Sequence, residues 1–484
     1  MLLILTPFFP FICALVLQFL PIWKNEKWRN WFVSFSLVGS FVLTLLLALG
    51  KDQQSALYNL AGIMPLGFMV DDTARLFSLL ATAMFLVSGI FAQGYFHKDD
   101  TAKRFFVFYI GTLGAILGVC YSSTPVSMYL FFELMTLISM GLVLHTKEKK
   151  SIVAGVKYLL YSVAGAMMGL FGIFYFSAGM ETATFSLGGN VFPAYLANNP
   201  ELSLWVLFIT VLGFGTKAGL FPMHGWLPTA HPVAPAPASA ILSGVVTKMG
   251  VICIIRMVFF VVGGSFMAST WVQTVLLTLS LITVFMGSMC AYKENNLKKR
   301  LAYSTVSQVS YVLFGVFTLN AVALNGAMMH VVFHSVMKNA LFLCAGSIIH
   351  QTHKTDVRDL RGMGAKMPVT FWCFTLAGVG LVGVPPLSGF ISKWGIASGA
   401  IASGIELFSW LGPVVLLLSA LLTAGYLIPI SVDAFFSNEK VDNIKEASCN
   451  MLVPVIVLAV LCVGLGIYVK PVDSITRFIM QFVS

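Results

Sequence analysis

Charged side chains inside long apolar stretches are the residues of this sequence with the clearest chemical potential. A charge near the centre of a bilayer costs roughly 3 kcal/mol or more, so such a residue is a functional candidate by default. One glutamate cannot pair with five lysines, and we expect some of these lysines to be neutral part of the time, which suits proton transfer. The set consists of Glu133, Lys157, Lys217, Lys248, Arg256, Lys338 and Lys393.

Depth within each stretch separates these residues. Glu133 lies near the middle of its segment in MYLFFELMTLISM, where it is either a structural ion-pair partner or a functional carboxylate, and we favour function. Lys248 lies midway along its segment, too deep to reach a headgroup layer easily. Lys157 and Arg256 lie within about two turns of a segment end, so their long side chains are expected to extend to the interface.

Two lysines neighbour prolines that should interrupt a helix. Lys217 stands five residues before Pro222, and a proline clashes with the carbonyl four residues before it. Lys393 follows the proline pair of VGVPPLSGFISKWGI, which should free the carbonyls of Leu381 and Val382. A simple kink is one explanation, but interrupted helices recur at the ion sites of transporters, and we favour function.

Histidines form a second group. HVVFHSVMK places His330, His334 and Lys338 on one helix face at steps of about 6 Å. Histidine exchanges protons near neutral pH, and we favour a proton wire over a metal site or two satisfied core histidines. His224 and His231 flank HGWLPTAHP, where they either hydrate a turn or line an uptake pathway, and the sequence leaves both readings open.

The composition requires a membrane around these residues. The chain has 484 residues, of which 58% are hydrophobic and 10% charged, and its mean hydropathy is +0.90. Soluble proteins average about 25% charged residues. The net charge of +10 lies mostly in short loops, which excludes nucleic-acid binding. The cysteines are scattered without metal spacing and no nucleotide, haem or cluster motif occurs, so we expect no cofactor or metal in this chain.

Continuous apolar segments of about twenty residues predict an all-α polytopic membrane protein with fourteen transmembrane helices. The first segment reads as a retained span, because it lacks the basic start and cleavage site of a signal peptide. The predicted spans are 2–20, 31–50, 73–95, 105–121, 125–144, 153–177, 202–223, 237–262, 271–292, 301–320, 327–350, 370–400, 408–436 and 451–469.

Basic residues are distributed unevenly between the two sides, with 19 in the odd-numbered loops and 4 on the opposite side. The positive-inside rule then places odd loops in the cytoplasm and both termini on the outer side of a prokaryotic cytoplasmic membrane. The odd loops carry Lys24, Lys27, Arg29, Lys98, Lys103, Arg104, Lys147, Lys149, Lys150, Lys293, Lys298, Lys299, Arg300, Lys354, Arg358, Arg361, Lys366, Lys440 and Lys445.

The chain reads as one membrane domain, residues 1–484, with internal symmetry. The interrupted seventh and twelfth spans lie five spans apart and run in opposite directions. This favours two inverted five-helix repeats, spans 4–8 (residues 105–262) and spans 9–13 (residues 271–436).

These motifs together resemble a known family: the antiporter-like membrane subunits of respiratory complex I, group 4 membrane-bound hydrogenases, formate hydrogenlyase-type complexes and multisubunit cation/proton antiporters. The resemblance covers nearly the whole chain. It rests on FFELMTL, GTKAGLFPMHGWLPTAHPVAPAPASAILSGVVTKMGV, NNLKKRLAYSTVSQVSYVLFG, HSVMKNALFLCAGSI and GVPPLSGFISKW. The AHPVAPAPASAILSGVVTKMG loop is closer to hydrogenase-type and cation-antiporter-type members.

The resemblance implies a role for each matching residue. Glu133 and Lys217 match the glutamate of the fifth span and its partner lysine, and Lys248 matches the central lysine of the eighth span. Lys393 matches the exit residue of the twelfth span, which some relatives replace with glutamate. The relay of the eleventh span is matched by His330, His334 and Lys338.

The expected function is therefore ion translocation, with the proton as the favoured ion, by the pumping subunit of a redox-driven hydrogenase-like or complex I-like assembly. The expected partners are lipid, further antiporter-like subunits and a peripheral arm with iron–sulfur clusters, which would supply the electron transfer. The alternative is a subunit of a secondary cation/proton antiporter. A non-pumping scaffold is the third reading, and costly buried charges argue against it.

Overall fold

The computed structural model describes residues 1–60, 64–437, 439 and 444–482. Lys440, one of the basic residues assigned to an odd-numbered loop, lies outside them. Within the described part, twelve helical segments are long and apolar enough to cross a membrane. They are α1 (Leu2–Phe19), α2 (Glu26–Leu49), α3 (Asp72–Tyr95), α4 (Ala102–Tyr121), α5 (Pro125–Val143), α6 (Lys149–Ser177), α8 (Pro200–Ala218), the segment Ala236–Val262, α13 (Trp271–Lys293), α15 (Ala321–Thr352), α18 (Glu406–Phe436) and α19 (Cys449–Ile467).

The two remaining predicted spans are helical but differ from these twelve. Residues 301–320 fall mainly in α14 (Leu297–Phe317). This helix is 21 residues long but carries too many polar side chains to count among the twelve apolar segments. Residues 370–400 form two shorter helices, α16 (Pro368–Val382) and α17 (Ser388–Ala402). The multi-pass helical architecture is confirmed, and the number fourteen stays a prediction.

The eighth predicted span is continuous but irregular. It consists of α10 (Ala236–Ile241), a π-helical turn (Leu242–Val246), α11 (Thr247–Ile255) and a second π-helical turn (Arg256–Val262). π-helical turns inside α-helices occur frequently at functional sites.

A β-hairpin joins α2 to α3, and the helical prediction did not include it. Strands β1 (Gln53–Leu60) and β2 (Met64–Val70) pair antiparallel. β2 rests on the junction of α4 and α5, where the Ser127 hydroxyl accepts the Gly67 N–H at 3.0 Å and the Ser123 N–H donates to the Gly67 carbonyl at 3.0 Å.

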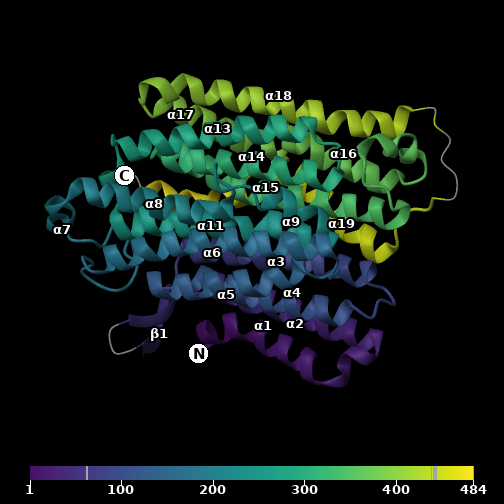
Figure 1. The fold of residues 1–484 in the computed structure, drawn as a ribbon, viewed down its shortest axis with the longest axis horizontal. Helices are drawn as coiled ribbons and strands as arrows, with labels where there is room; N and C mark the ends of the chain where they lie inside the picture. The colour runs from purple at the N-terminus through teal and green to yellow at the C-terminus, as the bar shows by residue number, and fades with distance from the viewer. Residues whose placement is uncertain (61–63, 438, 440–443, 483–484) are drawn as a thin grey trace.

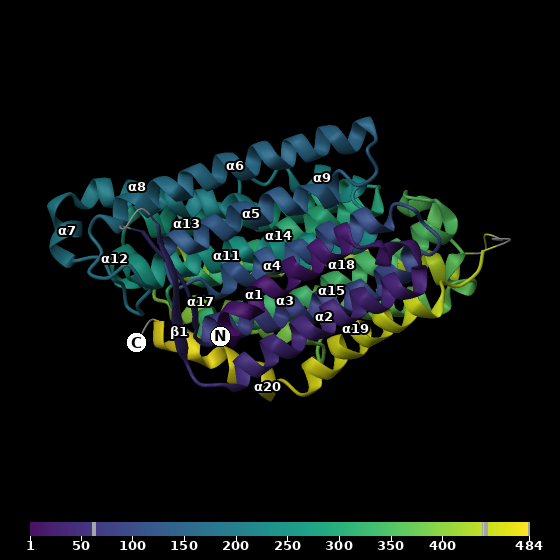
Figure 2. The ribbon, with the colours of Figure 1, turned by 90° about the horizontal axis from the view of Figure 1, so that it is seen from below.

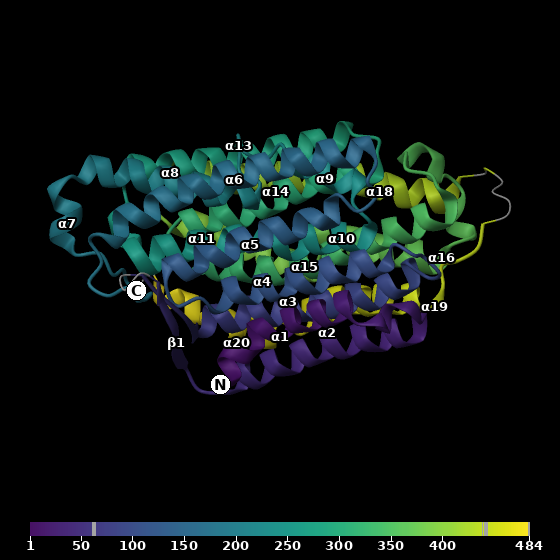
Figure 3. The ribbon, with the colours of Figure 1, turned by 60° about the horizontal axis from the view of Figure 1, so that its bottom comes forward.

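The long helices lie side by side along the longest axis of the molecule (Figure 1). Both chain ends, α7 (Pro193–Asn198) and the hairpin lie at one end of this bundle in all three ribbon views (Figures 1, 2 and 3). α15 occupies the centre, and 89% of its most apolar window is buried against α3, α10, α14, α16, α17 and α19.

The two halves show matching helix contacts. α4 packs on α5 as α13 packs on α14, and α6 packs on α8 as α15 packs on α17. These contacts are those expected of repeats over 105–262 and 271–436, which stay a prediction. The remaining short helices are Pro21–Lys24, α9 (Leu227–Val233), α12 (Gly264–Met267), Val357–Leu360, Met363–Ala365, α20 (Lys470–Thr476) and Arg477–Phe482.

Candidate functional site

Lys217 lies in the last turn of α8, where the helix is interrupted. α8 ends at Ala218, and Gly219 follows with φ of +88°, a left-handed conformation that suits glycine. The Trp226 indole N–H donates to the Thr216 carbonyl at 2.8 Å, so α9 folds back on this open turn. The interruption predicted beside Lys217 is present.

Hydroxyl groups surround the Lys217 ammonium. Its Nζ donates to Thr136 Oγ1 at 2.9 Å on α5, and to Tyr158 OH at 2.8 Å and Ser162 Oγ at 3.1 Å on α6. The Tyr158 ring centroid lies 4.4 Å from Nζ, close enough for a cation–π contact. A buried charge needs such partners, and these oxygens supply them without a carboxylate.

Glu133 lies on α5 one turn before Thr136, and the predicted Glu133–Lys217 ion pair is not formed in this structure. Within the described residues, no side-chain oxygen of Glu133 lies within 4.0 Å of the Lys217 ammonium, which is held by the hydroxyls instead. Glu133 still acts electrostatically on Lys217, and its buried Oε1 has no hydrogen-bond partner in the described part of the chain. The pair is therefore adjacent and disengaged.

Lys248 lies in α11 directly after the first π-helical turn. Its Nζ donates to the Ser243 carbonyl at 2.6 Å, within that turn, and approaches the Thr247 hydroxyl at 3.4 Å. The third partner is His334 Nδ1 of α15, at 2.7 Å. The eighth and eleventh predicted spans are thus joined by a direct lysine–histidine hydrogen bond.

The histidine stripe of α15 continues from this contact. The rings of His334 and His330 are stacked with centroids 5.8 Å apart. His330 Nδ1 lies 2.9 Å from Ser392 Oγ of α17, and its Nε2 lies 3.1 Å from Gln308 Oε1 of α14. Among the described residues, no three His, Cys, Asp or Glu side chains are grouped as a metal site requires.

Lys338 lies one turn beyond His334 toward the opposite end of α15. Its Nζ donates to the Leu301 carbonyl of α14 at 3.0 Å, and its charge acts electrostatically on His334. Lys338 therefore takes no part in the direct contacts that join Lys248, His334 and His330.

Lys393 lies in α17, after the second interruption. Its Nζ donates to the carbonyls of Leu381 at 2.6 Å and Val382 at 3.2 Å, the two groups that the proline pair was predicted to free. The Tyr311 ring centroid lies 5.0 Å from Nζ. Because Ser392 precedes Lys393, the contact between His330 and Ser392 brings the histidine stripe to the lysine.

The structure separates the two histidines of the HGWLPTAHP loop. His231 is fully buried, stacks on Phe342 of α15 at 4.9 Å, and has no partner for either ring nitrogen among the described residues. His224 stacks on Phe221 at 5.9 Å and lies near Lys157 of α6, whose Nζ is 5.9 Å from the Tyr161 ring. His231 therefore faces the centre of the bundle, and His224 lies on the α6 side.

Lys298 is a residue that the sequence reasoning assigned to a loop and thereby missed. It is only 8% exposed, and its Nζ donates to the carbonyls of Pro232 and Ala234 on either side of Val233. Its position in NNLKKRL, in the first turn of the polar helix α14, was the available signal. Lys298, Lys338 and Lys248 all act electrostatically on His231.

A polar cavity of about 570 Å³ opens next to Lys298 at the end of the bundle that carries the odd-numbered loops. Asp99, Arg104 and His145 lie along its wall, and His145 Nε2 is 3.0 Å from the Thr101 hydroxyl. Burial, with Arg104 adding to it and Asp99 opposing it, lowers the pKa of His145 to about 4. His145 is therefore uncharged at neutral pH, and its contact with the Thr101 hydroxyl holds this part of the cavity wall together.

Arg256 differs from its expected position. The sequence placed it close enough to a span end to reach the interface, but it is 1% exposed. Its guanidinium forms a bidentate pair with Asp71 at 2.6 and 2.8 Å and lies over the rings of Phe185 and Phe260. Asp71 also caps α3 by accepting the Ala74 N–H, so the Arg256–Asp71 pair ties the second π-helical turn to α3.

Comparison with known proteins places this architecture. Residues 122–423 match the family described as NADH:quinone oxidoreductase/Mrp antiporter, TM. NADH-quinone oxidoreductase subunit N of Desulforudis audaxviator is 30% identical over 413 residues, which cover 82% of this chain and 80% of that protein. Na(+)/H(+) antiporter subunit A1 of Staphylococcus aureus is 29% identical over 490 residues, which cover 95% of this chain and 60% of that longer protein.

A solved structure agrees in fold. A chain in the structure of the Mrp complex from Dietzia sp. DQ12-45-1b superposes with a TM-score of 0.84 at 17% identity, over 99% of both chains. The matched family residues include both interrupted helices and the site around Lys217, Lys248 and Lys393. The chain belongs to the family of antiporter-like membrane subunits of NADH:quinone oxidoreductases and Mrp antiporters.

Proposed function

We propose that this chain is the proton-translocating membrane subunit of a redox-driven, hydrogenase-like or complex I-like assembly. The observation that carries the proposal is the row of direct contacts from Lys248 through His334 and His330 to Ser392, next to Lys393. A scaffold has no use for a row of titratable groups held in an apolar interior at such cost.

The first step is the exchange of a proton on Lys217. Hydroxyl oxygens accept from an ammonium and hydroxyl protons donate to a neutral amine, so the shell of Thr136, Tyr158 and Ser162 accommodates both forms. When Glu133 lies close, it favours the charged form, and when it is drawn away the proton affinity of Lys217 falls. The disengaged arrangement supports this motion of Glu133 as the control point.

Transfer from Lys217 to Lys248 follows the contact between α8 and α11. Gly250, two residues after Lys248, faces Lys217: a methyl group there would lie 3.1 Å from Lys217 Cβ and 2.6 Å from the Phe214 carbonyl oxygen. The two lysine-bearing segments are therefore in backbone contact. We infer that a hydrated path of short length completes this step.

Transfer to the far side uses α15 and α17. Lys248 passes its proton to His334 Nδ1, and the stacked His330 hands it to Ser392 and Lys393. The buried nitrogen His334 Nε2 and the amide Gln308 Nε2 have no partner in the described part of the chain, and we infer that water at these unpaired groups links His334 to His330. Lys393 is the outlet residue.

Uptake uses the HGWLPTAHP loop and the polar cavity beside it. The cavity reaches Lys298, whose ammonium donates to the carbonyls of Pro232 and Ala234, directly after His231 in the chain. We propose that Lys298 and His231 load Lys338 and Lys248 from this side. His224, near Lys157, would serve the Lys217 side in the same way.

No electron-transfer group is assigned to this chain, so a redox arm with iron–sulfur clusters belongs to partner subunits in this proposal. The second candidate is a subunit of a secondary cation/proton antiporter, which the 29% identity to an Na(+)/H(+) antiporter subunit favours. The subunit composition of the purified native complex separates the two. Hydrogenase-like or cluster-binding subunits support the first candidate, and small antiporter subunits alone support the second.

The proposal is tested by Lys217→Ala in the intact complex reconstituted into vesicles. We expect ion pumping to fall at least about tenfold, which corresponds to about 1.4 kcal/mol, while the complex assembles normally. Lys51→Ala, in an even-numbered loop, is the control and should pump like the wild type. Undiminished pumping by Lys217→Ala at normal assembly contradicts the relay.

A further inference from the structure

A surface groove is formed by the connection between α1 and α2 and the start of α2. This connection lies toward the end of the bundle opposite both chain termini (Figure 1). The volume of the groove is about 630 Å³, and its lining includes Ile22, Lys24, Trp28, Trp31, Phe32 and Phe35. α1 and α2 lie at the edge of the bundle, and only 39% and 33% of the residues in their most apolar 18-residue stretches are buried. The groove therefore faces the surroundings of the protein.

An exposed apolar track leads from the groove along α2. Trp28, Trp31 and Phe35 expose 68%, 76% and 59% of their surfaces, and Val38 and Val42 continue the same face. Their spacing of three and four residues places them in line, and the 14 helical steps from Trp28 to Val42 cover about 21 Å. This length matches an extended acyl chain, and tryptophan is typical of the membrane–water interface.

Positive charge gathers at the polar end of the track. Lys24 lies in the groove, Lys27 is exposed in the first turn of α2, and Lys103 Nζ lies 4.8 Å from the ring of Trp23 beside it. This end of the bundle carries the odd-numbered loops, the cytoplasmic side under the predicted topology.

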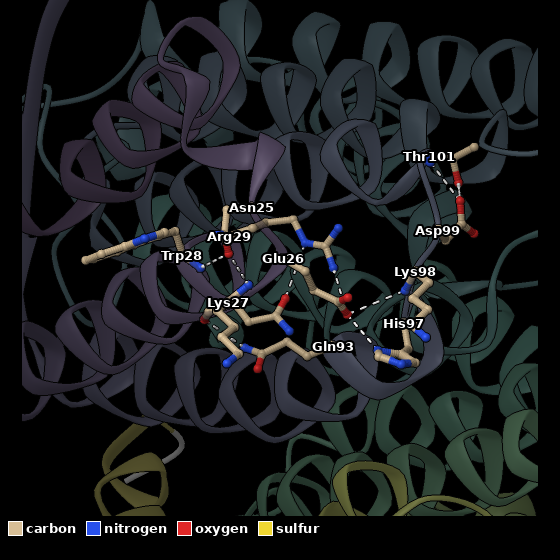
Figure 4. A network of polar contacts seen from close by, with 11 residues as sticks. Asn25, Glu26, Lys27, Trp28, Arg29, Gln93, His97, Lys98, Asp99 and Thr101 are labelled. Carbon is tan, nitrogen blue, oxygen red and sulfur yellow. Dashed lines mark hydrogen bonds and ion pairs between the residues drawn. The ribbon is translucent and has the colours of Figure 1, made fainter.

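The carboxylate of Glu26, the residue before Lys27, is already engaged. Glu26 Oε1 lies 2.8 Å from His97 Nδ1 and 3.5 Å from Arg29 Nη2. Figure 4 shows these groups turned toward one another, while Trp28 extends away from them. The positive charge of Lys24 and Lys27 therefore has no acidic partner within the groove.

We propose that this groove binds a phospholipid with an anionic headgroup. The phosphate lies between Lys24 and Lys27, the tryptophans hold the glycerol region, and one acyl chain follows the track from Trp31 to Val42. The site is independent of the proton relay. It requires that α1 and α2 contact lipid at the groove, not a partner subunit.

The test uses the purified native complex, stripped of lipid and titrated with phosphatidylglycerol, phosphatidylcholine or inorganic phosphate under native mass spectrometry. Wild type should retain phosphatidylglycerol in preference to phosphatidylcholine. The variant Lys24→Gln/Lys27→Gln should bind phosphatidylglycerol about 25-fold more weakly, since each of the two basic residues contributes a factor of about five. Its affinity for phosphatidylcholine should not change.

Two further variants sharpen the result. Trp28→Ala/Trp31→Ala should weaken the binding of both lipids by a similar factor, because it removes contacts with the glycerol region and the start of the acyl chain, which the two lipids share. Lys293→Gln/Lys366→Gln removes two exposed charges at the same end of the bundle, away from the groove, and should behave as wild type. Equal retention of both lipids, an equal loss in this control, displacement of phosphatidylglycerol by inorganic phosphate, or a groove covered by a partner subunit in the complex each overturns the proposal.

Discussion

The lysines at the two interrupted helices are held by different chemistry. Lys217 precedes its interruption and donates to three side-chain hydroxyls, with Glu133 one turn away from one of them. Lys393 follows its interruption and donates to the carbonyls of Leu381 and Val382, the last two residues of α16. Each ammonium also lies over a tyrosine ring.

Within the proposed relay, this difference suits the two sites to different tasks. Hydroxyls donate as well as accept, so the Lys217 shell tolerates both protonation states of the amine. Carbonyls only accept, and those at a helix C-terminus carry partial negative charge, so the Lys393 site favours the ammonium. The first site suits a switch that changes its charge, and the second suits an acceptor that draws the proton outward.

The largest expected effect comes from the pair Lys217→Met and Lys393→Met. Both should lower pumping at least about tenfold, because each removes one carrier from the relay. Their stabilities should differ: the hydroxyls left by Lys217 can rotate to one another, whereas the fixed carbonyls left by Lys393 lose their donor, at a cost of about 1–3 kcal/mol.

Thermal unfolding of the two purified variants measures that difference. We expect a lower Tm for Lys393→Met than for Lys217→Met. Equal Tm values would show that the carbonyls find another donor, and the contrast between a switch and an acceptor would lose its basis.

A smaller effect should separate the two tyrosines. Tyr158 bonds Lys217 and Ser139 through its hydroxyl, whereas Tyr311 donates its hydroxyl to the Leu416 carbonyl and meets Lys393 only through its ring. Tyr158→Phe should lower pumping about threefold to tenfold, which corresponds to the roughly 1 kcal/mol that a typical hydrogen bond contributes.

Tyr311→Phe is the matched control, because it keeps the ring over Lys393. It should lower the Tm slightly, because the hydrogen bond from its hydroxyl to the Leu416 carbonyl is lost, and leave the pumping rate per assembled complex unchanged. A loss of pumping in Tyr311→Phe as large as that in Tyr158→Phe would remove the distinction between the two lysine sites.

Local sequence was sufficient for much of this comparison. Long apolar stretches predicted the helices, and the proline pair before Lys393 identified the two carbonyls that hold its ammonium. The prediction worked because proline acts on a carbonyl four residues away, within one helix turn. The end of α8 at Ala218 follows from Gly219 in the same local way.

Features that depend on distant contacts were not predictable. The hydroxyl shell of Lys217 comes from α5 and α6, and the Arg256–Asp71 pair joins residues 185 positions apart. The hairpin was overlooked because it lies between two long apolar segments, and because its second strand is placed by contacts with the distant α4–α5 junction. The π-helical turns beside Lys248 have no simple sequence signature, and the separate surroundings of His224 and His231 depend on which helices enclose the loop.

The smallest expected effect tests the glycines that end the two interrupted helices. Gly219 and Gly383 have φ of +88° and +93°, so alanine at either position should cost about 1 kcal/mol of stability. The new methyl at 219 would lie 2.5 Å from Leu227 Cδ1, a flexible side-chain end, whereas that at 383 would lie 3.2 Å from Cδ of Lys393 itself. Gly219→Ala should therefore lower the Tm without changing pumping per complex.

Gly383→Ala should lower the Tm and also reduce pumping about twofold. The new methyl displaces Lys393 from its carbonyls by a few tenths of an ångström, and this weakens hydrogen bonds that depend steeply on geometry. Pumping measured on equal amounts of assembled complex distinguishes the two, and equal pumping in both variants would mean that the Lys393 ammonium does not depend on its position against α16.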